Sequence, residues 1–251
     1  MTTPALPIVY CHGLPGGSGE WAACAPAGQS AFAPDRNAPI MPAALAAQVR
    51  AEFGSTPIRL IGFSLGASVA LALARELGDQ AACIDLVSPA GPLQLGDFLN
   101  AMAGGPLFML AARHPRLFRG VARLESLLAR AAPAFLFDRL FASAAGADRA
   151  LRTDPAFRAA MAQTLRSGLG HDPRGFIHEV TDYVADWRAM LSQFDRPVTI
   201  WQGDADNWTP PAMSAALAAA LPGPVTLHHL PGCSHYSALR AALAQLSEHP
   251  T

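Results

Sequence analysis

The chain has 251 residues, about half of them hydrophobic, and a formal net charge of −1 at neutral pH. This length suits one large α/β domain or a core with an inserted subdomain. The near-zero charge argues against a nucleic-acid partner or another polyanion. The cysteines are widely spaced and no metal-ligand spacing occurs, so we expect reduced thiols and no metal at Cys11, Cys24, Cys83 and Cys233.

The amino-terminal segment MTTPALP has neither the basic region nor the apolar core of a signal peptide. The nearest approach to a membrane span is Ala101–Ala112, which is too short and contains Gly104-Gly105-Pro106. We therefore expect a cytoplasmic protein without a membrane span.

The first predicted element is a buried strand of a parallel sheet, Pro7–Cys11 (PIVYC), which ends at a glycine-rich loop. The next segment, Gly17–Ala22 (GSGEWA), also fits the dinucleotide pattern G-x-G-x-x-A, with Asp35 at a suitable distance. In that pattern the glycines come directly at the end of the strand, whereas here a proline-containing loop intervenes. We therefore disfavour a dinucleotide site and expect no cofactor.

A second short strand is predicted at Ala31–Ala33, stopped by Pro34. A helix is predicted over Pro42–Phe53, because proline suits the first turn of a helix and Gly54 suits its end.

The stretch Ile58–Leu77 (IRLIGFSLGASVALALAREL) is the most informative of the chain. A short apolar run leads into G-x-S-x-G at Gly62–Gly66, and an alanine- and leucine-rich helix follows. This is the pattern of a nucleophile elbow, a sharp strand-to-helix turn that exposes a serine hydroxyl. Glycines on either side of Ser64 leave room for the neighbouring strand and helix. The stretch therefore predicts Ser64 as a nucleophile.

The pattern changes after the next strand, Ala82–Val87. Between residues 91 and 193 the sequence predicts helices broken by glycine and proline, and no convincing strand. One helix is expected over Phe176–Leu191. Another is expected to turn an apolar stripe inward, formed by Leu117, Val121, Leu124 and Leu128. We interpret residues 91–193 as a helical cap inserted into a core formed by residues 1–90 and 194–251.

Strands and helices alternate again as strand Pro197–Trp201, helix Met213–Leu221, strand Val225–Leu230 and a last helix from Ser237 to Leu246. The loop after the first of these strands contains Asp204 and Asp206, and the loop after the second contains His235. Because the carboxyl ends of parallel strands meet at one edge, these side chains are expected beside Ser64. The chain order serine, acid, histidine is the order that a triad on an elbow requires.

Two aspartates compete as the acid of this triad. The spacing from Gly203 favours Asp206, whereas Asp204 suits a turn residue that hydrogen-bonds to its own backbone. Of the remaining histidines, we expect His12 to be a structural hydrogen-bonding residue of the first loop.

Five ordered motifs resemble those of the α/β-hydrolase superfamily: HGLPG at His12–Gly16, APDR at Ala33–Arg36, GFSLG at Gly62–Gly66, GDAD at Gly203–Asp206 and GCSH at Gly232–His235. The resemblance covers nearly the whole core, whereas residues 91–193 match only in position and helical character. It implies the α/β-hydrolase fold, with a mostly parallel sheet and a triad of Ser64, Asp206 and His235. It also implies an oxyanion hole formed by the backbone N–H groups of Leu14 and Leu65.

The sequence departs from the family at its start. Relatives have a β-hairpin before the HGLPG strand, and here only Met1–Leu6 precedes it. We therefore expect a core of about six strands with Ala31–Ala33 as an exposed edge. Exposed edges favour pairing, so a homodimer through this edge is also expected.

One scaffold hosts many activities, so the motifs indicate the reaction less specifically than the fold. The triad suits acyl transfer, and we expect hydrolysis of small to medium carboxylic esters through an acyl-enzyme. Thioester hydrolysis, lyase chemistry and cofactor-free haloperoxidase chemistry on the same triad are alternatives. A non-enzymatic binding protein is disfavoured, because such proteins typically lose a triad member and all three persist here.

Residues 91–193 contain twelve arginines and nine acidic residues. This excess of positive charge has two interpretations. It favours either an anionic group on the substrate or, as the more ordinary alternative, a solvated helix face.

Overall fold

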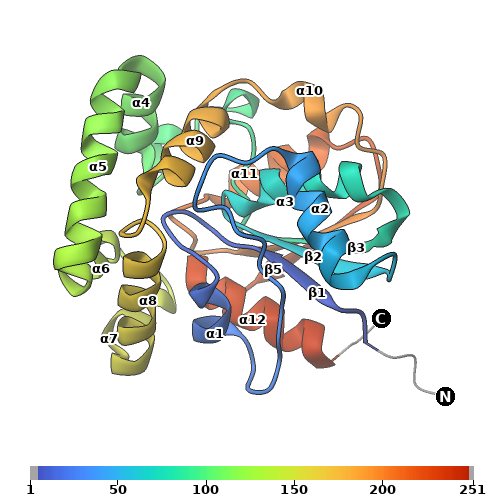
Figure 1. Ribbon diagram of the computed structural model, residues 1–251, viewed down its shortest axis with the longest axis horizontal. Helices are drawn as coiled ribbons and strands as arrows, with labels where there is room; N and C mark the ends of the chain where they lie inside the picture. Colours follow the sequence, from blue (N-terminus) through green and yellow to red (C-terminus); the bar gives the residue numbers. More distant parts are fainter. Residues whose placement is uncertain (1–4, 249–251) are drawn as a thin grey trace.

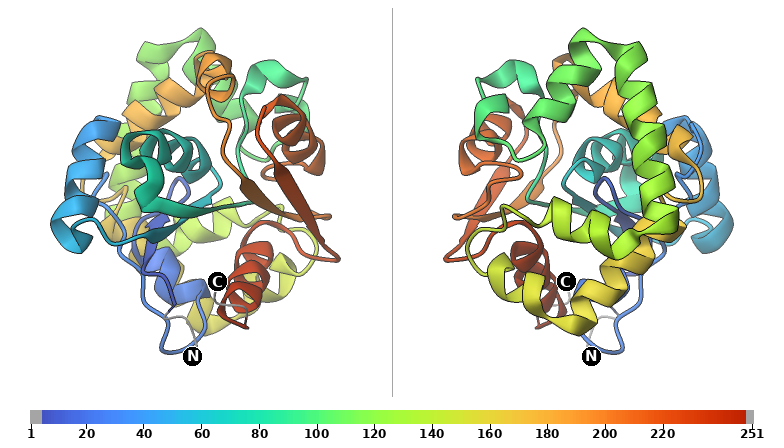
Figure 2. Two further views of the ribbon diagram at one scale, coloured as in Figure 1. Left: turned by 90° about the vertical axis from the view of Figure 1, so that its right-hand side faces the viewer. Right: turned by 90° about the vertical axis from the view of Figure 1, so that its left-hand side faces the viewer.

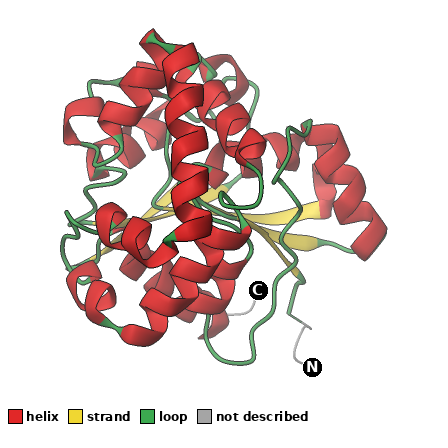
Figure 3. Cartoon of the chain, turned by 60° about the vertical axis from the view of Figure 1, so that its left-hand side comes forward, coloured by secondary structure: helices red, strands yellow, loops and turns green. Residues whose placement is uncertain are grey.

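The computed structural model describes residues 5–248 and contains a five-stranded parallel sheet with helices on both faces (Figure 1, Figure 3). The strands lie in chain order across the sheet: β1 (Ile8–Cys11), β2 (Ile58–Phe63), β3 (Ala81–Val87), β4 (Val198–Gly203) and β5 (Val225–Leu230). One face is covered by α2 (Pro42–Phe53), α3 (Gly66–Leu77) and α11 (Pro211–Ala220), and the other by α1 (Gly19–Cys24) and α12 (His235–Glu248).

The central strands are apolar without interruption because both of their faces are covered. Every residue of β2 is buried. Alternate residues enter different cores: Leu60 packs in the cluster with α2 and α3, and Ile61 packs in the cluster with α12. The predicted parallel sheet of an α/β-hydrolase fold is therefore confirmed, and the predicted helix Pro42–Phe53 has the predicted ends.

The predicted strand Ala31–Ala33 is reduced to a single parallel bridge between Phe32 and Val9. Two hydrogen bonds hold it, from the Tyr10 N–H to the Phe32 carbonyl and from the Phe32 N–H to the Ile8 carbonyl. The segment lies along β1, as expected for an edge, and the sheet of five strands is close to the predicted core of about six. The missing hairpin before β1 was inferred from residues that lie largely outside those described, and the dimer on this edge stays a prediction.

Between β3 and β4 the described chain forms helices and loops, with no strand. Proline occupies the first turn of five of these helices, where its missing N–H costs nothing. In chain order, all the helices of this segment are α4 (Gly105–Arg113), α5 (Pro115–Ala131), α6 (Pro133–Leu140), α7 (Asp148–Thr153), α8 (Pro155–Ser167), α9 (Pro173–Val184) and α10 (Arg188–Leu191), with short 3-10 turns at Leu93–Leu95 and Leu99–Ala101. Within residues 5–248, none of the helices combines the length and the apolar character needed to cross a membrane.

The single helix predicted over Phe176–Leu191 was wrong. The chain leaves the helical conformation at Ala185, and α10 begins three residues later. At the break, the Asp186 carboxylate accepts a hydrogen bond from the Arg188 N–H and pairs with the Arg188 guanidinium.

The predicted inward stripe of α5 was also largely wrong. Leu117 and Leu124 have 59% and 58% of their surface exposed, and of the four predicted residues only Val121 lines a cavity. The buried face of α5 instead carries smaller residues beside one aromatic ring, at Phe118, Ala122, Ser126 and Ala129. Helices α4, α6, α8 and α9 contact α5, and Leu117 and Leu124 lie outside its buried face.

The glycines of the elbow are required by close contacts, as predicted. A Cβ atom on Gly66 would lie 2.1 Å from the carbonyl oxygen of Cys11, and one on Gly62 would lie 2.7 Å from the Ala70 Cβ. The strand β1, the helix α3 and the turn between β2 and α3 are therefore packed backbone to backbone.

We predict that Gly66→Ala lowers the free energy of unfolding by about 2 kcal/mol or more, because the contacting atoms are backbone and cannot move aside. Gly120 is the matched control, since it lies in α5 with no atom within 4 Å of an added Cβ. Gly120→Ala is expected to raise the free energy of unfolding by about 0.5–1 kcal/mol. Urea denaturation measures both, and equal changes in the two variants would contradict the packing argument.

Candidate active site

Ser64 occupies the turn between β2 and α3 in a left-handed backbone conformation, with a φ of 55°. Non-glycine residues rarely adopt this conformation, and it persists where the surroundings impose it. Here the Ser64 N–H donates to the Val87 carbonyl at 3.1 Å, and the Ser64 carbonyl accepts from the Ala90 N–H at 3.0 Å. The loop after β3 therefore holds the serine in its strained turn, at the wall of a cavity.

The structure brings His235 and Asp206 together, as predicted. The His235 Nδ1 atom lies 2.9 Å from Asp206 Oδ2, and both side chains are almost fully buried. The imidazole packs on Phe63, the residue before Ser64, with 4.6 Å between ring centroids, and stacks on Trp208 at 5.2 Å. The histidine ring is thus oriented by a carboxylate at one nitrogen and by aromatic contacts.

Asp206 is kept ionised by its partners. Burial alone would raise its pKa, but His235 and hydrogen bonds hold the pKa below the usual value. The Trp208 and Thr209 N–H groups donate to Oδ1 at 2.8 and 3.0 Å, and the Thr209 hydroxyl lies 3.0 Å from Oδ2. Asp204 has no such contact with the imidazole and instead accepts from the Gly232 N–H at 2.8 Å.

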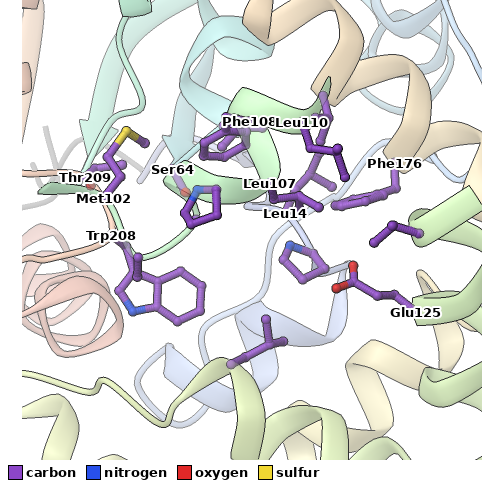
Figure 4. Close-up of a pocket in the computed structure, with 18 of the residues that line it drawn as sticks. Leu14, Ser64, Met102, Leu107, Phe108, Leu110, Glu125, Phe176, Trp208 and Thr209 are labelled. Atoms are coloured by element: carbon purple, nitrogen blue, oxygen red, sulfur yellow. The ribbon is translucent and has the colours of Figure 1, made fainter. Parts of the chain in front are cut away.

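Leu14 and Leu65 both line the cavity beside Ser64, and Figure 4 shows Leu14 at its wall. Among the described residues, no acceptor receives a hydrogen bond from either backbone N–H. Leu65 immediately precedes α3, whose positive dipole end adds to the local field.

The predicted structural role of His12 is confirmed, because its carbonyl oxygen and Nδ1 both contact the Arg36 guanidinium, at 2.7 and 2.9 Å.

Sequence reasoning missed Glu20, a fully buried carboxylate behind the loop that contains Leu14. Its Oε2 accepts from the Gly13 N–H at 2.9 Å and from the Tyr10 hydroxyl at 3.0 Å, and its Oε1 accepts from the Tyr236 hydroxyl at 3.2 Å. Burial raises the pKa of Glu20 to about 7, although these three hydrogen bonds act against it. Glu20 thereby links the loop after β1 to the residue next to His235.

Sequence reasoning also missed Asp148, a fully buried residue at the start of α7. Its carboxylate accepts from the Tyr236 and Ser237 N–H groups at 3.0 and 2.7 Å, so it caps the first turn of α12, which begins at His235. The Ala147 N–H also donates to the Gly232 carbonyl. No sequence signal connects residues 148 and 236, which are far apart in the chain.

The cavity beside Ser64 has a volume of about 390 Å³ and is lined mainly by apolar side chains. They come from the loops after β1, β2 and β4 and from α4, α5 and α9, and include Leu107, Leu110, Phe176, Val180 and Trp208. Figure 4 shows Glu125 of α5 reaching into this cavity from the side away from Ser64 and Trp208. Burial raises the pKa of Glu125, and Arg139, 3.6 Å away, partly offsets this effect.

Apart from Arg139, no arginine of residues 91–193 lines the cavity within the described chain. The excess of arginine therefore agrees better with a solvated helix face than with a site for an anionic substrate group. Among residues 5–248, no three His, Cys, Asp or Glu side chains are grouped in a way that could hold a metal ion.

Residues 42–238 match the family described as serine aminopeptidase, S33. No curated protein matches the sequence at a significant level. Solved structures with a similar fold include a thermophilic esterase from Thermogutta terrifontis, with 20% identity and a TM-score of 0.63 over 98% of this chain and 89% of that one. Cfl2 from Burkholderia cenocepacia has 17% identity and a TM-score of 0.70, covering 100% and 90% of the two chains. A bromoperoxidase from Bacillus anthracis has 15% identity and a TM-score of 0.62, covering 98% and 93%.

The contacts of the two aspartates predict losses of activity of very different size. Asp206→Asn should lower kcat about 10³–10⁴-fold with substrates cleaved by Ser64, because the amide cannot fix the imidazole tautomer or stabilise the imidazolium. Asp204→Asn is the matched control and should lower kcat less than about tenfold, since its amide oxygen can still accept from Gly232. Steady-state kinetics on both variants would contradict the assignment if Asp204→Asn were the more damaging.

The raised pKa of Glu20 predicts how stability depends on pH. Between pH 4.5, the ordinary pKa of the carboxyl, and about 7, the folded protein retains a proton that the unfolded chain has lost. The free energy of unfolding should therefore fall as pH rises through this window, by up to about 3 kcal/mol from this group, and then level off.

Glu20→Gln should abolish this contribution, because the amide mimics the protonated carboxyl. Urea denaturation of both proteins at pH 4.5, 6 and 8 measures the difference, with the exposed Glu52→Gln as the control. An unchanged pH profile in Glu20→Gln would show that Glu20 does not titrate in this range.

Proposed function

Because the chain belongs to the serine aminopeptidase S33 family of α/β-hydrolases, we propose that it is a serine hydrolase that cleaves small to medium carboxylic esters. The observation that carries this proposal is the buried Asp206–His235 pair, which lies beside the strained turn of Ser64 at the wall of an apolar cavity. The fold neighbours include an esterase, which agrees with this activity.

In the proposed mechanism, the Ser64 hydroxyl attacks the ester carbonyl carbon while His235 Nε2 takes the hydroxyl proton. The negative charge that develops on the carbonyl oxygen is stabilised by the N–H groups of Leu14 and Leu65, which have no other acceptor among the described residues. His235 then returns the proton to the leaving alcohol, and an acyl-enzyme remains. A water molecule, activated by the same imidazole, releases the acid and restores Ser64.

The shape of the cavity limits the substrate. A volume of about 390 Å³ with an apolar lining suits a hydrophobic acyl group of small to medium size. We propose that residues 91–193 form a cap over this site, on a core of residues 1–90 and 194–251, since α4, α5 and α9 supply much of the cavity wall.

Glu125 supports a second candidate function, cleavage of an amino-terminal residue. It is the one carboxylate that lines the cavity in the described chain, and it could pair with a substrate ammonium group. Its ion pair with Arg139 competes with this use, so we place ester hydrolysis first. Thioester hydrolysis and haloperoxidase chemistry use the same triad and stay as further alternatives.

A fluorophosphonate probe should label the protein once, at Ser64, and Ser64→Ala should abolish both labelling and turnover. A series of p-nitrophenyl esters of rising chain length should show an optimum at short to medium acyl groups. Aminoacyl p-nitroanilides and acyl-CoA thioesters, assayed in parallel, measure the alternatives. If kcat/KM for either class is higher than for any ester, that class and not a carboxylic ester is the substrate. Labelling that survives in Ser64→Ala would overturn the assignment of the nucleophile.

A further inference from the structure

The outer surface of α5 is unusually apolar for a helix that faces water. Leu117, Leu124 and Leu127 have 57–59% of their surface exposed. On α6, which packs against α5, Phe135 is also 57% exposed. These four residues account for most of the large exposed hydrophobic side chains within residues 5–248, the other being Met41, at the start of α2.

A strip of arginines runs beside these leucines on the same helix. Arg116, Arg119 and Arg123 are exposed, and helical spacing places them along one side of the leucine strip. None of the three forms an ion pair with a described residue. Glu125, the one acidic residue of α5, lines the cavity instead of this surface. The exposed half of α5 is therefore divided into an apolar sector and an unneutralised basic sector.

This surface lies at the outside of the molecule. Helix α5 forms the left-hand edge of the view in Figure 1 and faces the viewer in the right-hand view of Figure 2. Val121, close to Leu117 and Leu124 on the helix, lines the cavity that contains Ser64. The apolar sector is thus continuous with the wall of the candidate active site.

We propose that the α5 face, defined by Leu117, Leu124, Leu127, Arg116, Arg119 and Arg123, docks on an anionic lipid membrane surface. A helix that presents leucines beside arginines, at low overall hydrophobicity, has the composition of an interfacial helix. The leucines would enter the boundary between headgroups and acyl chains, and each arginine would be attracted by the negative surface potential of anionic lipids. The inference goes beyond the proposed function and does not depend on catalysis by Ser64.

Charge disfavours a second copy of this chain as the occupant. Two α5 faces packed against each other would bring six arginines into one interface, and the face itself has no carboxylate to neutralise them. Like charges in such an interface are costly, whereas an anionic membrane supplies the missing negative charge. The experiment must therefore distinguish membrane binding from self-association of the chain.

The full-length protein is mixed with sedimenting vesicles of phosphatidylcholine alone, or of phosphatidylcholine with phosphatidylglycerol, at low and high salt. We expect binding to the anionic vesicles, weaker binding to the neutral ones, and loss of the difference at high salt because salt screens the arginines. Ser64→Ala should bind as the wild type does, which separates this test from that of the proposed function.

Two triple variants test the two sectors. Leu117→Ser/Leu124→Ser/Leu127→Ser should lower the partition coefficient about tenfold or more, because it removes the apolar groups that enter the membrane. Arg116→Gln/Arg119→Gln/Arg123→Gln should lower it about 100-fold on anionic vesicles and little on neutral ones. Met41→Ser and Arg50→Gln, at exposed sites at and within α2, are the controls and should bind as the wild type does.

Fluorophosphonate labelling and thermal unfolding verify that each variant is folded. The proposal is overturned if the wild type does not sediment with anionic vesicles, or if either triple variant binds them as tightly as the wild type. It is also overturned if analytical ultracentrifugation shows a dimer that the leucine variant abolishes while neither protein binds vesicles. That result would assign the face to a second copy.

Discussion

The close contact between the start of α3 and the end of β1 is the constraint on which the candidate site depends. A Cβ atom on Gly66 would meet the carbonyl oxygens of Cys11 and His12 at 2.1 and 2.5 Å. This approach brings the loop that contains Leu14 next to the turn that contains Ser64. The two N–H groups that we propose as the oxyanion hole, of Leu14 and Leu65, lie on these two neighbouring segments. The strained φ of Ser64 is imposed by packing on both sides.

Three buried carboxylates from different segments converge on the start of α12. Asp206 fixes the ring of His235, Asp148 caps the following N–H groups, and Glu20 accepts from the hydroxyl of Tyr236. Each is hydrogen-bonded, as a buried carboxyl must be if it is not to destabilise the fold. The position of the His235 imidazole thus depends on the loop after β4, on α7 and on α1 together, so a small shift in any of these segments would move the ring.

Local patterns predicted the elements of the core well, because strands covered on both faces and helices with proline starts and glycine ends have clear signals. They failed where contacts between distant segments of the chain determine which side chains are buried. The leucines of α5 have the right spacing for a buried stripe, but the neighbouring helices pack on the smaller face of Phe118, Ala122 and Ser126. The contacts of Glu20 and Asp148 could not be predicted either, since their partners lie 216 and 88 residues away.

The contact of Asp148 with α12 has a consequence for how this fold can change. Exchange of the whole segment between β3 and β4 is one route by which evolution or an engineer alters specificity. Here the segment that would be exchanged also caps the helix of His235, and Gly146 packs against the Gly232 carbonyl in a left-handed conformation, with a φ of 48°. A chimera that replaces residues 91–193 as a block would remove that support, so recombination has to retain the short stretch 145–148 as part of the core.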